Sequence, residues 1–369
     1  MSFFSDILKK KNISALGIDI GSSSIKVVQL RKKGDKAILE TYGELSLGPY
    51  GGVSVGESTN LPTEKIAQAM NDLLSEKEVA VTTKVCGIAI PFRASLMSVI
   101  EMPANIKEKE LATMIPIEAR KYIPVPISDV TIDWSIIPKL ESEDEASRTA
   151  NVNKPETREI LLVAIHNRII DQYKEIVTKS GLDAKFFEIE VFSSMRAVLE
   201  GIKGAVMIFD MGASTTKLYI VERGLIHYSH TINRGSQDIT ANIARIINVS
   251  TEEAEVLKRS VGMGKTLDGA DLSEAVSVVA DQIFSEANRF LLDFQKKENR
   301  NVKSIFLTGG GSALKGFREL AAQNFKVEVV AGDPFEKVET PAFLEEILKV
   351  TGPEFTVSVG AALRCLGEL

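Results

Sequence analysis

Residues 16–30 read LGIDIGSSSIKVVQL, two short apolar strands joined by a turn of one glycine and three serines. An acidic residue, Asp19, stands near the end of the first strand. Glycine lets a ligand approach the outward-pointing backbone N–H groups of such a turn, and the serine hydroxyls add donors, so residues 21–24 suit phosphate oxygens. A carboxylate cannot bind phosphate directly, but it can hold the waters of a Mg²⁺ ion that bridges phosphates. The stretch therefore predicts a phosphate-binding hairpin with a metal ion; an Asx turn that only closes the hairpin is the alternative.

The second half of the chain repeats this pattern. Residues 204–228, GAVMIFDMGASTTKLYIVERGLIHY, again read as strand, turn, strand, turn and strand. Such a repeat indicates an internal duplication, with two similar domains facing each other across a cleft, and it weighs against the Asx-turn alternative. We expect the two aspartates, Asp19 and Asp210, to hold one metal ion between them. The alignment pairs Asp19 with Asp210, Gly21 with Gly212, Ser22 and Ser23 with Ala213 and Ser214, Ser24 with Thr215, and Lys26 with Lys217.

A third glycine-rich loop follows a buried strand pattern in the last quarter of the chain. Residues 308–316, TGGGSALKG, separate that strand from a helical pattern. A loop of this kind lets the backbone pack against a ligand, and here we expect the sugar and α-phosphate of a nucleotide. The residues expected to bind there are Gly309, Gly310, Gly311 and Ser312.

Composition excludes some classes of function. The 369 residues are 44% hydrophobic and 25% charged with a formal net charge of -6, so nothing suggests the basic face of a nucleic-acid binder. The two cysteines, Cys86 and Cys365, lie among apolar or small residues and indicate buried thiols in a reducing, cytoplasmic setting. No apolar run approaches the roughly 20 residues of a membrane-spanning helix. The N-terminal MSFFSDILKKK either touches an anionic membrane surface or packs on the body as a terminal turn.

The region between the two repeats has a different character. Within residues 94–166 we expect a strand at residues 97–101, a helix at residues 107–122, and two strands, TIDWSII and REILLVAI, on either side of a polar surface loop at residues 141–156. This pattern predicts a small α+β subdomain inserted into the duplicated α/β fold.

The three loops GIDIGSSSIKVV, IFDMGASTTKLYI and IFLTGGGSALKG resemble, in that order, the two phosphate motifs and the adenosine motif of the superfamily of actin, sugar kinases and heat-shock chaperone ATPases. The resemblance covers essentially the whole chain and implies an actin-like, ribonuclease H-like duplicated fold. The serine-rich first turn, the inserted subdomain and the total length resemble most the PilM family of type IV pilus assembly proteins, with the FtsA cell-division family a close relative. The implied parts are a first actin-like subdomain (residues 1–93 and 167–204), the inserted α+β subdomain (94–166), a second actin-like subdomain (205–232 and 303–369) and a helical subdomain at the nucleotide cleft (233–302).

The resemblance places further site residues. Glu190 in FEIEVFSSMRAV matches the residue that positions the attacking water, and with Asp210 it would form the catalytic pair; a carboxylate that only stabilises a helix start is the alternative. In AEVLKRSVG, three residues match the helix that touches ribose and adenine, although the stretch alone reads as a solvated helix face. They are Glu255, Lys258 and Arg259. The implied cofactors are ATP or ADP and Mg²⁺.

The resemblance implies an adaptor in which ATP is chiefly a structural ligand. Its partner would be the N-terminal cytoplasmic tail of PilN, held between the first actin-like subdomain and the inserted one, which would place the chain peripherally at the inner membrane. Contacts with other pilus assembly proteins and self-association are also implied. We expect slow or absent hydrolysis, because Ala213 stands where many relatives have glycine and serines replace the usual threonines of the first turn.

Two other classes of protein share this fold. A sugar or metabolite kinase would need a catalytic base facing a second substrate, and the sequence suggests none beyond the carboxylates already named. An FtsA-like filament protein is disfavoured, because this sequence stops at AALRCLGEL, where that family continues into a membrane-targeting helix.

Overall fold

The computed structural model describes residues 13–137, 156–202 and 204–369. The chain divides into two compact units, one of residues 1–90 and 176–369 and the other of residues 91–175. The N-terminal apolar segment and nearly all of the predicted polar loop lie outside the described residues. The division into four subdomains stays a prediction.

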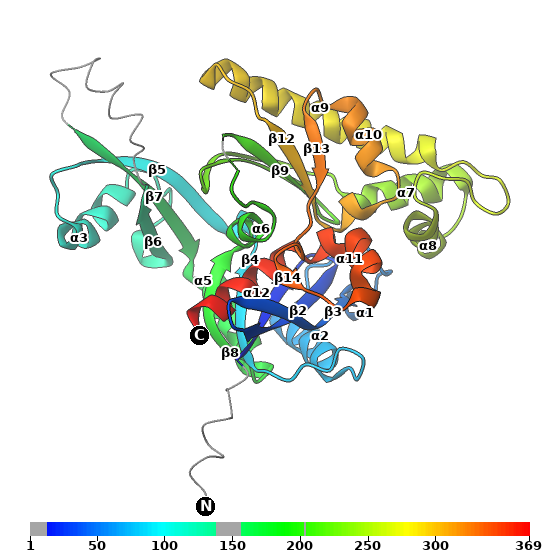
Figure 1. The fold of residues 1–369 in the computed structure, drawn as a ribbon, viewed down its shortest axis with the longest axis horizontal. Coiled ribbons are helices and arrows are strands. Elements are labelled where there is room, and N and C mark those ends of the chain that lie inside the picture. Colours follow the sequence, from blue (N-terminus) through cyan, green and yellow to red (C-terminus); the bar gives the residue numbers. More distant parts are fainter. Residues whose placement is uncertain (1–12, 138–155, 203) are drawn as a thin grey trace, which may run out of the picture. The chain divides into compact units, whose positions relative to one another are not determined.

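The larger unit contains a six-stranded sheet in the order β14-β3-β2-β1-β4-β8 (Figure 1). Strands β1, β2 and β3 form the predicted antiparallel meander, and β4 pairs with β1 in parallel. Helix α12 packs so closely on β1 that a Cβ atom at Gly17 would lie 1.9 Å from the Ser358 carbonyl oxygen. The elements are β1 (Ser14–Ile20), β2 (Ser24–Lys33), β3 (Lys36–Ser46), β4 (Val85–Ile90), β8 (Asp183–Ile189), β14 (Val338–Glu339) and α12 (Thr356–Glu368).

A five-stranded sheet in the same unit repeats this arrangement in the order β11-β10-β9-β12-β13. Strands β9, β10 and β11 form an antiparallel meander, and β12 pairs with β9 in parallel, as β4 does with β1. The predicted duplication is therefore visible in the strand order. The strands are β9 (Val206–Met211), β10 (Thr216–Glu222), β11 (Leu225–Ile232), β12 (Ser304–Thr308) and β13 (Glu328–Ala331).

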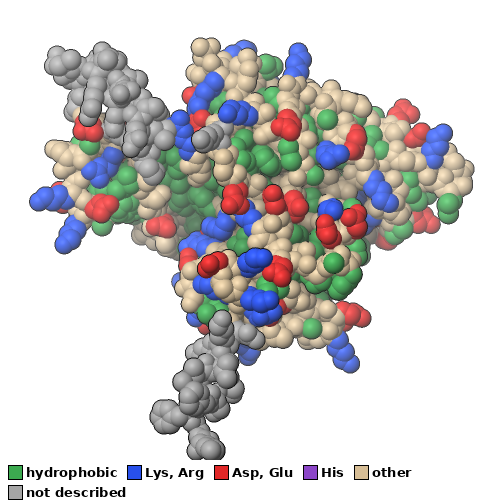
Figure 2. All heavy atoms as spheres, viewed as in Figure 1, with side chains coloured by type: hydrophobic (Ala, Val, Ile, Leu, Met, Phe, Trp, Pro, Cys, Tyr) green, Lys and Arg blue, Asp and Glu red, His purple; other side chains and the backbone are tan. Residues whose placement is uncertain are grey.

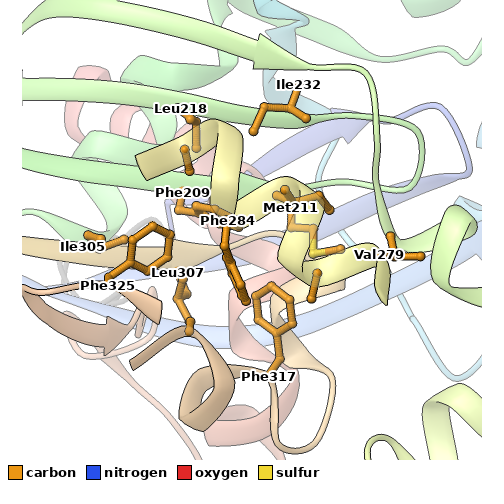
Figure 3. Close-up of a cluster of buried hydrophobic side chains, with 14 of the residues drawn as sticks. Phe209, Met211, Leu218, Ile232, Val279, Phe284, Ile305, Leu307, Phe317 and Phe325 are labelled. Carbon is orange, nitrogen blue, oxygen red and sulfur yellow. The ribbon is translucent and has the colours of Figure 1, made fainter. Parts of the chain in front are cut away.

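Helices cover the two sheets and complete their cores. Phe284 of α9 packs against Phe317 and Phe325, with ring centroids 5.3 and 5.2 Å apart, and against Phe209 of β9 (Figure 3). Burial of such aromatic side chains dominates core energetics. The helices are α1 (Gly48–Gly51), α2 (Thr63–Ser75), α6 (Glu190–Val198), α7 (Ser236–Ile247), α8 (Thr251–Val261), α9 (Ser273–Glu298), α10 (Phe317–Asn324) and α11 (Glu345–Thr351).

Among the described residues, the smaller unit contains a three-stranded antiparallel sheet with helix α3 packed on it, as the sequence predicts. Its strands run in the order β5-β7-β6, and Leu111 and Ile115 of α3 are fully buried in its core. Helix α5 begins in this unit and continues past its boundary. The elements are β5 (Ser95–Pro103), α3 (Glu108–Ala119), β6 (Val130–Ile136), β7 (Thr157–His166) and α5 (Asn167–Lys179).

The buried setting predicted for the two cysteines is confirmed. Cys86 and Cys365 are both free and buried. Basic and acidic side chains are interspersed on the face shown in Figure 2. None of the described helices is long and apolar enough to cross a membrane.

Candidate functional site

A cavity of about 330 Å³ in the larger unit brings the three glycine-containing loops together. This volume lies within the range typical of small-molecule sites. Ser214 and Ser312, which the sequence also predicts, do not line it. The predicted residues that do line it are Asp19, Gly21, Ser22, Ser23, Ser24, Lys26, Glu190, Asp210, Gly212, Ala213, Thr215, Glu255, Lys258, Arg259, Gly309, Gly310 and Gly311.

The two phosphate-type turns have the same local geometry. In the first, the Gly21 N–H donates to the Ser24 carbonyl oxygen at 2.9 Å; in the second, the Gly212 N–H donates to the Thr215 carbonyl oxygen at 2.9 Å. Closing each turn from within in this way leaves its tip free to face a ligand. Ser214 is held away from the cavity wall, because its hydroxyl pairs with that of Ser22 at 3.2 Å.

The third loop requires glycine at its first position. Gly309 has φ +81°, and a Cβ atom there would lie 2.5 Å from both Asp210 Oδ1 and the Met211 carbonyl oxygen. The loop therefore packs directly against the end of β9. It continues as a 3₁₀ turn at Gly310–Ala313 before α10 begins, and the Ser312 hydroxyl donates back to the Gly309 carbonyl oxygen at 2.7 Å. This bond explains why Ser312 does not face the cavity.

Two carboxylates and one lysine lie together beside the second turn. Lys217 Nζ lies 2.8 Å from Glu190 Oε2 and 3.3 Å from Asp210 Oδ2, and all three side chains are largely buried. Helix α6 begins at Glu190, so its first turn supplies that carboxylate. We did not predict Lys217 as a site residue, although its alignment with Lys26 was the signal that could have found it.

Asp19 differs from Asp210 in having no close partner. Within the described ranges, no hydrogen bond or ion pair engages its side chain. Burial, with the charges of Glu190 and Asp210, raises the pKa of the Asp19 carboxyl to about 6, although Lys26 and Lys217 oppose the shift. An oxygen donor of this kind suits a hydrated divalent cation. Across the described residues, no group of three or more His, Cys, Asp or Glu side chains is arranged to hold a metal ion.

Helix α8 presents a cluster of ion pairs to the cavity. Its start is set by a capping box in which the Ser250 side chain accepts from the Glu253 N–H. One turn later, Glu255 Oε2 lies 2.6 Å from Lys258 Nζ, and Glu255 Oε1 lies 2.7 Å from Arg259 Nε. Burial works against the charge on Glu255, but Lys258 lowers the pKa of this carboxyl overall. Glu255 thus holds two cations at the cavity wall.

Two cavity residues, Glu44 and Glu354, gave no signal in the sequence. Glu44 lies 3.0 Å from Lys26 Nζ. The pKa of Glu44 is lowered to about 2, because Lys26 and a hydrogen bond with Ser24 outweigh the effect of burial. Glu354 shows the opposite shift: burial and the neighbouring Glu44 charge raise its pKa to about 7. The two carboxyls come from β3 and from the turn before α12, so only the folded chain brings them together.

Comparison with known proteins identifies the family. The model of the family described as type IV pilus assembly protein PilM matches residues 17–366. The chain belongs to the PilM family. A solved structure of a PilM-PilN type IV pilus biogenesis complex has a TM-score of 0.76 to this chain at 25% sequence identity, covering 96% of this chain and 99% of the other.

The chain is also similar to cell-division proteins and to a further solved structure. The FtsA protein of Neisseria meningitidis serogroup B is 25% identical over 366 residues, covering 88% of this chain and 86% of the relative, and FtsA of Streptococcus pneumoniae serotype 2 is 22% identical with 90% and 78% covered. Ethanolamine utilization protein EutJ from Carboxydothermus hydrogenoformans has a TM-score of 0.53 at 16% identity, covering 95% of this chain and 89% of the other, and shows likeness of fold alone. The actin-like fold predicted from the three loops is confirmed.

Proposed function

We propose that this PilM-family chain is a nucleotide-binding adaptor of type IV pilus assembly, which binds ATP or ADP in the cavity and the N-terminal cytoplasmic tail of PilN elsewhere on its surface. The observation that carries the proposal is the convergence of three backbone-exposing loops on one cavity. Turns of this kind bind phosphate through N–H groups and hydroxyls. Partner binding through the PilN tail would keep the chain peripherally at the inner membrane.

We assign different residues of the cavity lining to the two ends of a nucleotide. The first two turns and Lys26 offer N–H, hydroxyl and ammonium donors that suit the β- and γ-phosphates. The loop that begins at Gly309 and the cations on α8 are assigned to the sugar and base. Asp19, with no close partner among the described side chains, would hold Mg²⁺ through its waters. When bound, the ion would neutralise phosphate charge.

The adaptor role is supported by family membership and by the match to a PilM-PilN complex over nearly the whole chain. The smaller unit contains none of the three loops. Its three-stranded sheet has β5 and β6 as outer strands, and β5 exposes 38% of Leu96 and 43% of Val99. An extended peptide can add to such an edge through backbone hydrogen bonds, with apolar contacts supplying selectivity. We assign the PilN tail to this edge.

A peptide-binding measurement tests the adaptor role. A synthetic peptide of the PilN N-terminal tail from the same organism, followed by fluorescence anisotropy with and without ATP, should bind with an affinity nearer micromolar than nanomolar, because a disordered tail loses entropy on ordering. Val99→Asp should weaken binding by about tenfold or more. Ile246→Asp is the matched control, because Ile246 of α7 in the larger unit is also 43% exposed.

The outcomes separate two parts of the proposal. No binding of the peptide under either condition would overturn the adaptor role. Normal peptide binding by a folded Val99→Asp variant would overturn the assignment of the PilN tail to β5 but would leave the adaptor role standing. Rapid phosphate transfer to a sugar in a substrate screen would instead place the chain among the kinases.

A further inference from the structure

The two duplicated hairpins place a lysine opposite each aspartate. In the first, Asp19 of β1 pairs in register with Lys26 of β2; in the second, Asp210 of β9 pairs in register with Lys217 of β10. Directly opposed residues of an antiparallel pair project from the same face of the sheet. Strand register therefore places each lysine beside the aspartate of its own hairpin.

The two lysines nevertheless form ion pairs with different carboxylates in the two halves. Lys26 turns to Glu44 at 3.0 Å and to the Ser24 hydroxyl at 2.7 Å. Lys217 instead binds Glu190 at 2.8 Å and its cross-strand partner Asp210 at 3.3 Å. Among the described residues, Asp19 thus has no ion-pair partner, whereas Asp210 is paired with Lys217.

The surroundings of Lys217 make this ammonium a lasting part of the site. Its side chain is 19% exposed, and those of Glu190 and Asp210 are 8% and 10% exposed, so water screens the three charges poorly. The Lys217 ammonium therefore supplies a buried positive charge to both carboxylates.

Both oxygens of the Asp210 carboxylate already have close neighbours. Oδ2 faces Lys217 Nζ, and Oδ1 faces Gly309, where an added Cβ atom would lie only 2.5 Å away. A divalent cation at Oδ2 would be repelled by the Lys217 ammonium beside it, or would displace the ammonium and leave it with Glu190 as its ion-pair partner. The predicted sharing of one metal ion by Asp19 and Asp210 disagrees with this arrangement.

We propose that Lys217 is a resident countercharge for Asp210 and Glu190, which takes the place of a divalent cation at Asp210 and keeps Glu190 from activating water. The proposal rests on the proposed nucleotide function. Asp19 would then be left to hold Mg²⁺ through waters without the help of Asp210, so ATP or ADP binding should depend only weakly on Mg²⁺. Hydrolysis should be slow, because one lysine occupies the place of the cation at Asp210 and also binds Glu190, the carboxylate expected to activate water. Lys217 is in this sense a residue that determines what the site does with a bound nucleotide.

Calorimetric titration with ADP, in Mg²⁺ and in EDTA, is the first test. The native chain should lose less than about threefold in affinity when Mg²⁺ is removed, whereas Lys217→Met should lose about tenfold or more. Lys26→Met is the matched control from the other hairpin: it should weaken binding equally with and without Mg²⁺, because Lys26 does not pair with an aspartate. A loss of more than about tenfold by the native chain in EDTA would overturn the proposal.

The second test needs no nucleotide, so it still decides if the native chain binds no ADP and the proposed function fails. Lys217→Met leaves two buried carboxylates without their cation and should lower the thermal midpoint. Mn²⁺ alone should then raise the midpoint of Lys217→Met by about 2 °C or more, and that of the native chain by less than about 1 °C. Lys217→Arg keeps the charge and should behave as the native chain.

The outcomes of this test are also distinct. The proposal would be wrong if Mn²⁺ did not raise the thermal midpoint of a folded Lys217→Met variant. It would also be wrong if Mn²⁺ raised the midpoint of the native chain as much as that of the variant. If Lys217→Met does not fold, the comparison of Mg²⁺ with EDTA in the native chain decides.

Discussion

The hydroxyl oxygens of Ser22 and Ser214 lie 3.2 Å apart, although 192 positions separate the two residues in the chain. They belong to the two duplicated turns, so the hydrogen bond joins the tips of the two halves, with Ser22 in the cavity lining and Ser214 just outside it. A ligand with several phosphates that enters between the turns must compete with this contact.

This contact predicts a nucleotide-sensitive crosslink. The double variant Ser22→Cys with Ser214→Cys should form a disulfide under mild oxidation, because the two side chains already meet and the native cysteines are buried. ATP or ADP should slow its formation by about tenfold, since occupied turns would be held apart. Non-reducing electrophoresis with mass spectrometry measures this. Equal rates with and without nucleotide would argue that phosphates do not lie between the turns.

Gly309→Ala should lower the affinity for nucleotide by about tenfold or more. The added Cβ atom would collide with Asp210 and the Met211 backbone. This collision would push the third loop away from the second turn. Gly269→Ala is the control, because Gly269 has a similar φ of +89° but open space around its Cβ position. Both variants carry the strain of alanine in the left-handed region, so a calorimetric titration with ADP isolates the effect of the collision. Equal affinities in the two variants would exclude the third loop from the site.

Stability should depend on pH through Glu354. Burial and the charge of Glu44 raise the Glu354 pKa from 4.5 to about 7, so the folded chain keeps a proton that the unfolded chain loses. Stability therefore falls as pH rises from 4.5 through 7. Glu354→Gln removes this loss and should be more stable than the native chain by about 1 to 3 kcal/mol above pH 7, with the difference vanishing below pH 4.5.

Glu44→Gln supplies the opposite control for that measurement. The Glu44 pKa is lowered from 4.5 to about 2, so its contribution is fully present above pH 4.5 and is lost as pH falls to about 2. Glu44→Gln should therefore destabilise the chain at neutral pH. Chemical denaturation at several pH values measures both variants, and parallel pH profiles for the two would contradict the assigned shifts.

Glu188 should be the main ionic contribution to the stability of the first sheet. Its 5% exposed carboxylate receives the guanidinium groups of Arg196 from α6 and Arg364 from α12, at 2.6 and 2.8 Å, and the hydroxyl of Ser193. Glu188→Gln leaves Arg196 without its charge partner and Arg364 with the exposed Glu368, and it should cost about 3 kcal/mol of unfolding free energy. Glu368, which also pairs with Arg364 but is 45% exposed, provides the control. Glu368→Gln should lower the free energy of unfolding by less than about 1 kcal/mol in the same denaturation assay. Equal losses in the two variants would show that burial does not determine how much these ion pairs stabilise the chain.

Local sequence was sufficient to predict the duplicated hairpins and the three loops. A turn between two apolar strands is set by residues within a few positions of one another, and glycine, serine and threonine carry the backbone freedom and hydroxyl donors that such turns need. The inserted α+β unit was predictable for the same reason, because the changes in hydrophobic period along residues 94–166 are local. The resemblance to the PilM family rested on these local patterns and is confirmed by the family match.

Tertiary structure alone decided which charged groups meet in the cavity. Strand register places Lys26 and Lys217 equivalently, but their partners, Glu44 and Glu190, come from β3 and α6 and occupy different positions in the two halves. The same holds for Glu354, whose neighbour Glu44 is more than 300 positions away in the chain. A buried charge is stable only where a group of opposite charge compensates the cost of removing it from water. Which group does so depends on the distant segments that the fold brings within a few ångströms. For this reason the sequence indicated a phosphate site, while only the fold showed that one of its two aspartates is paired with a lysine.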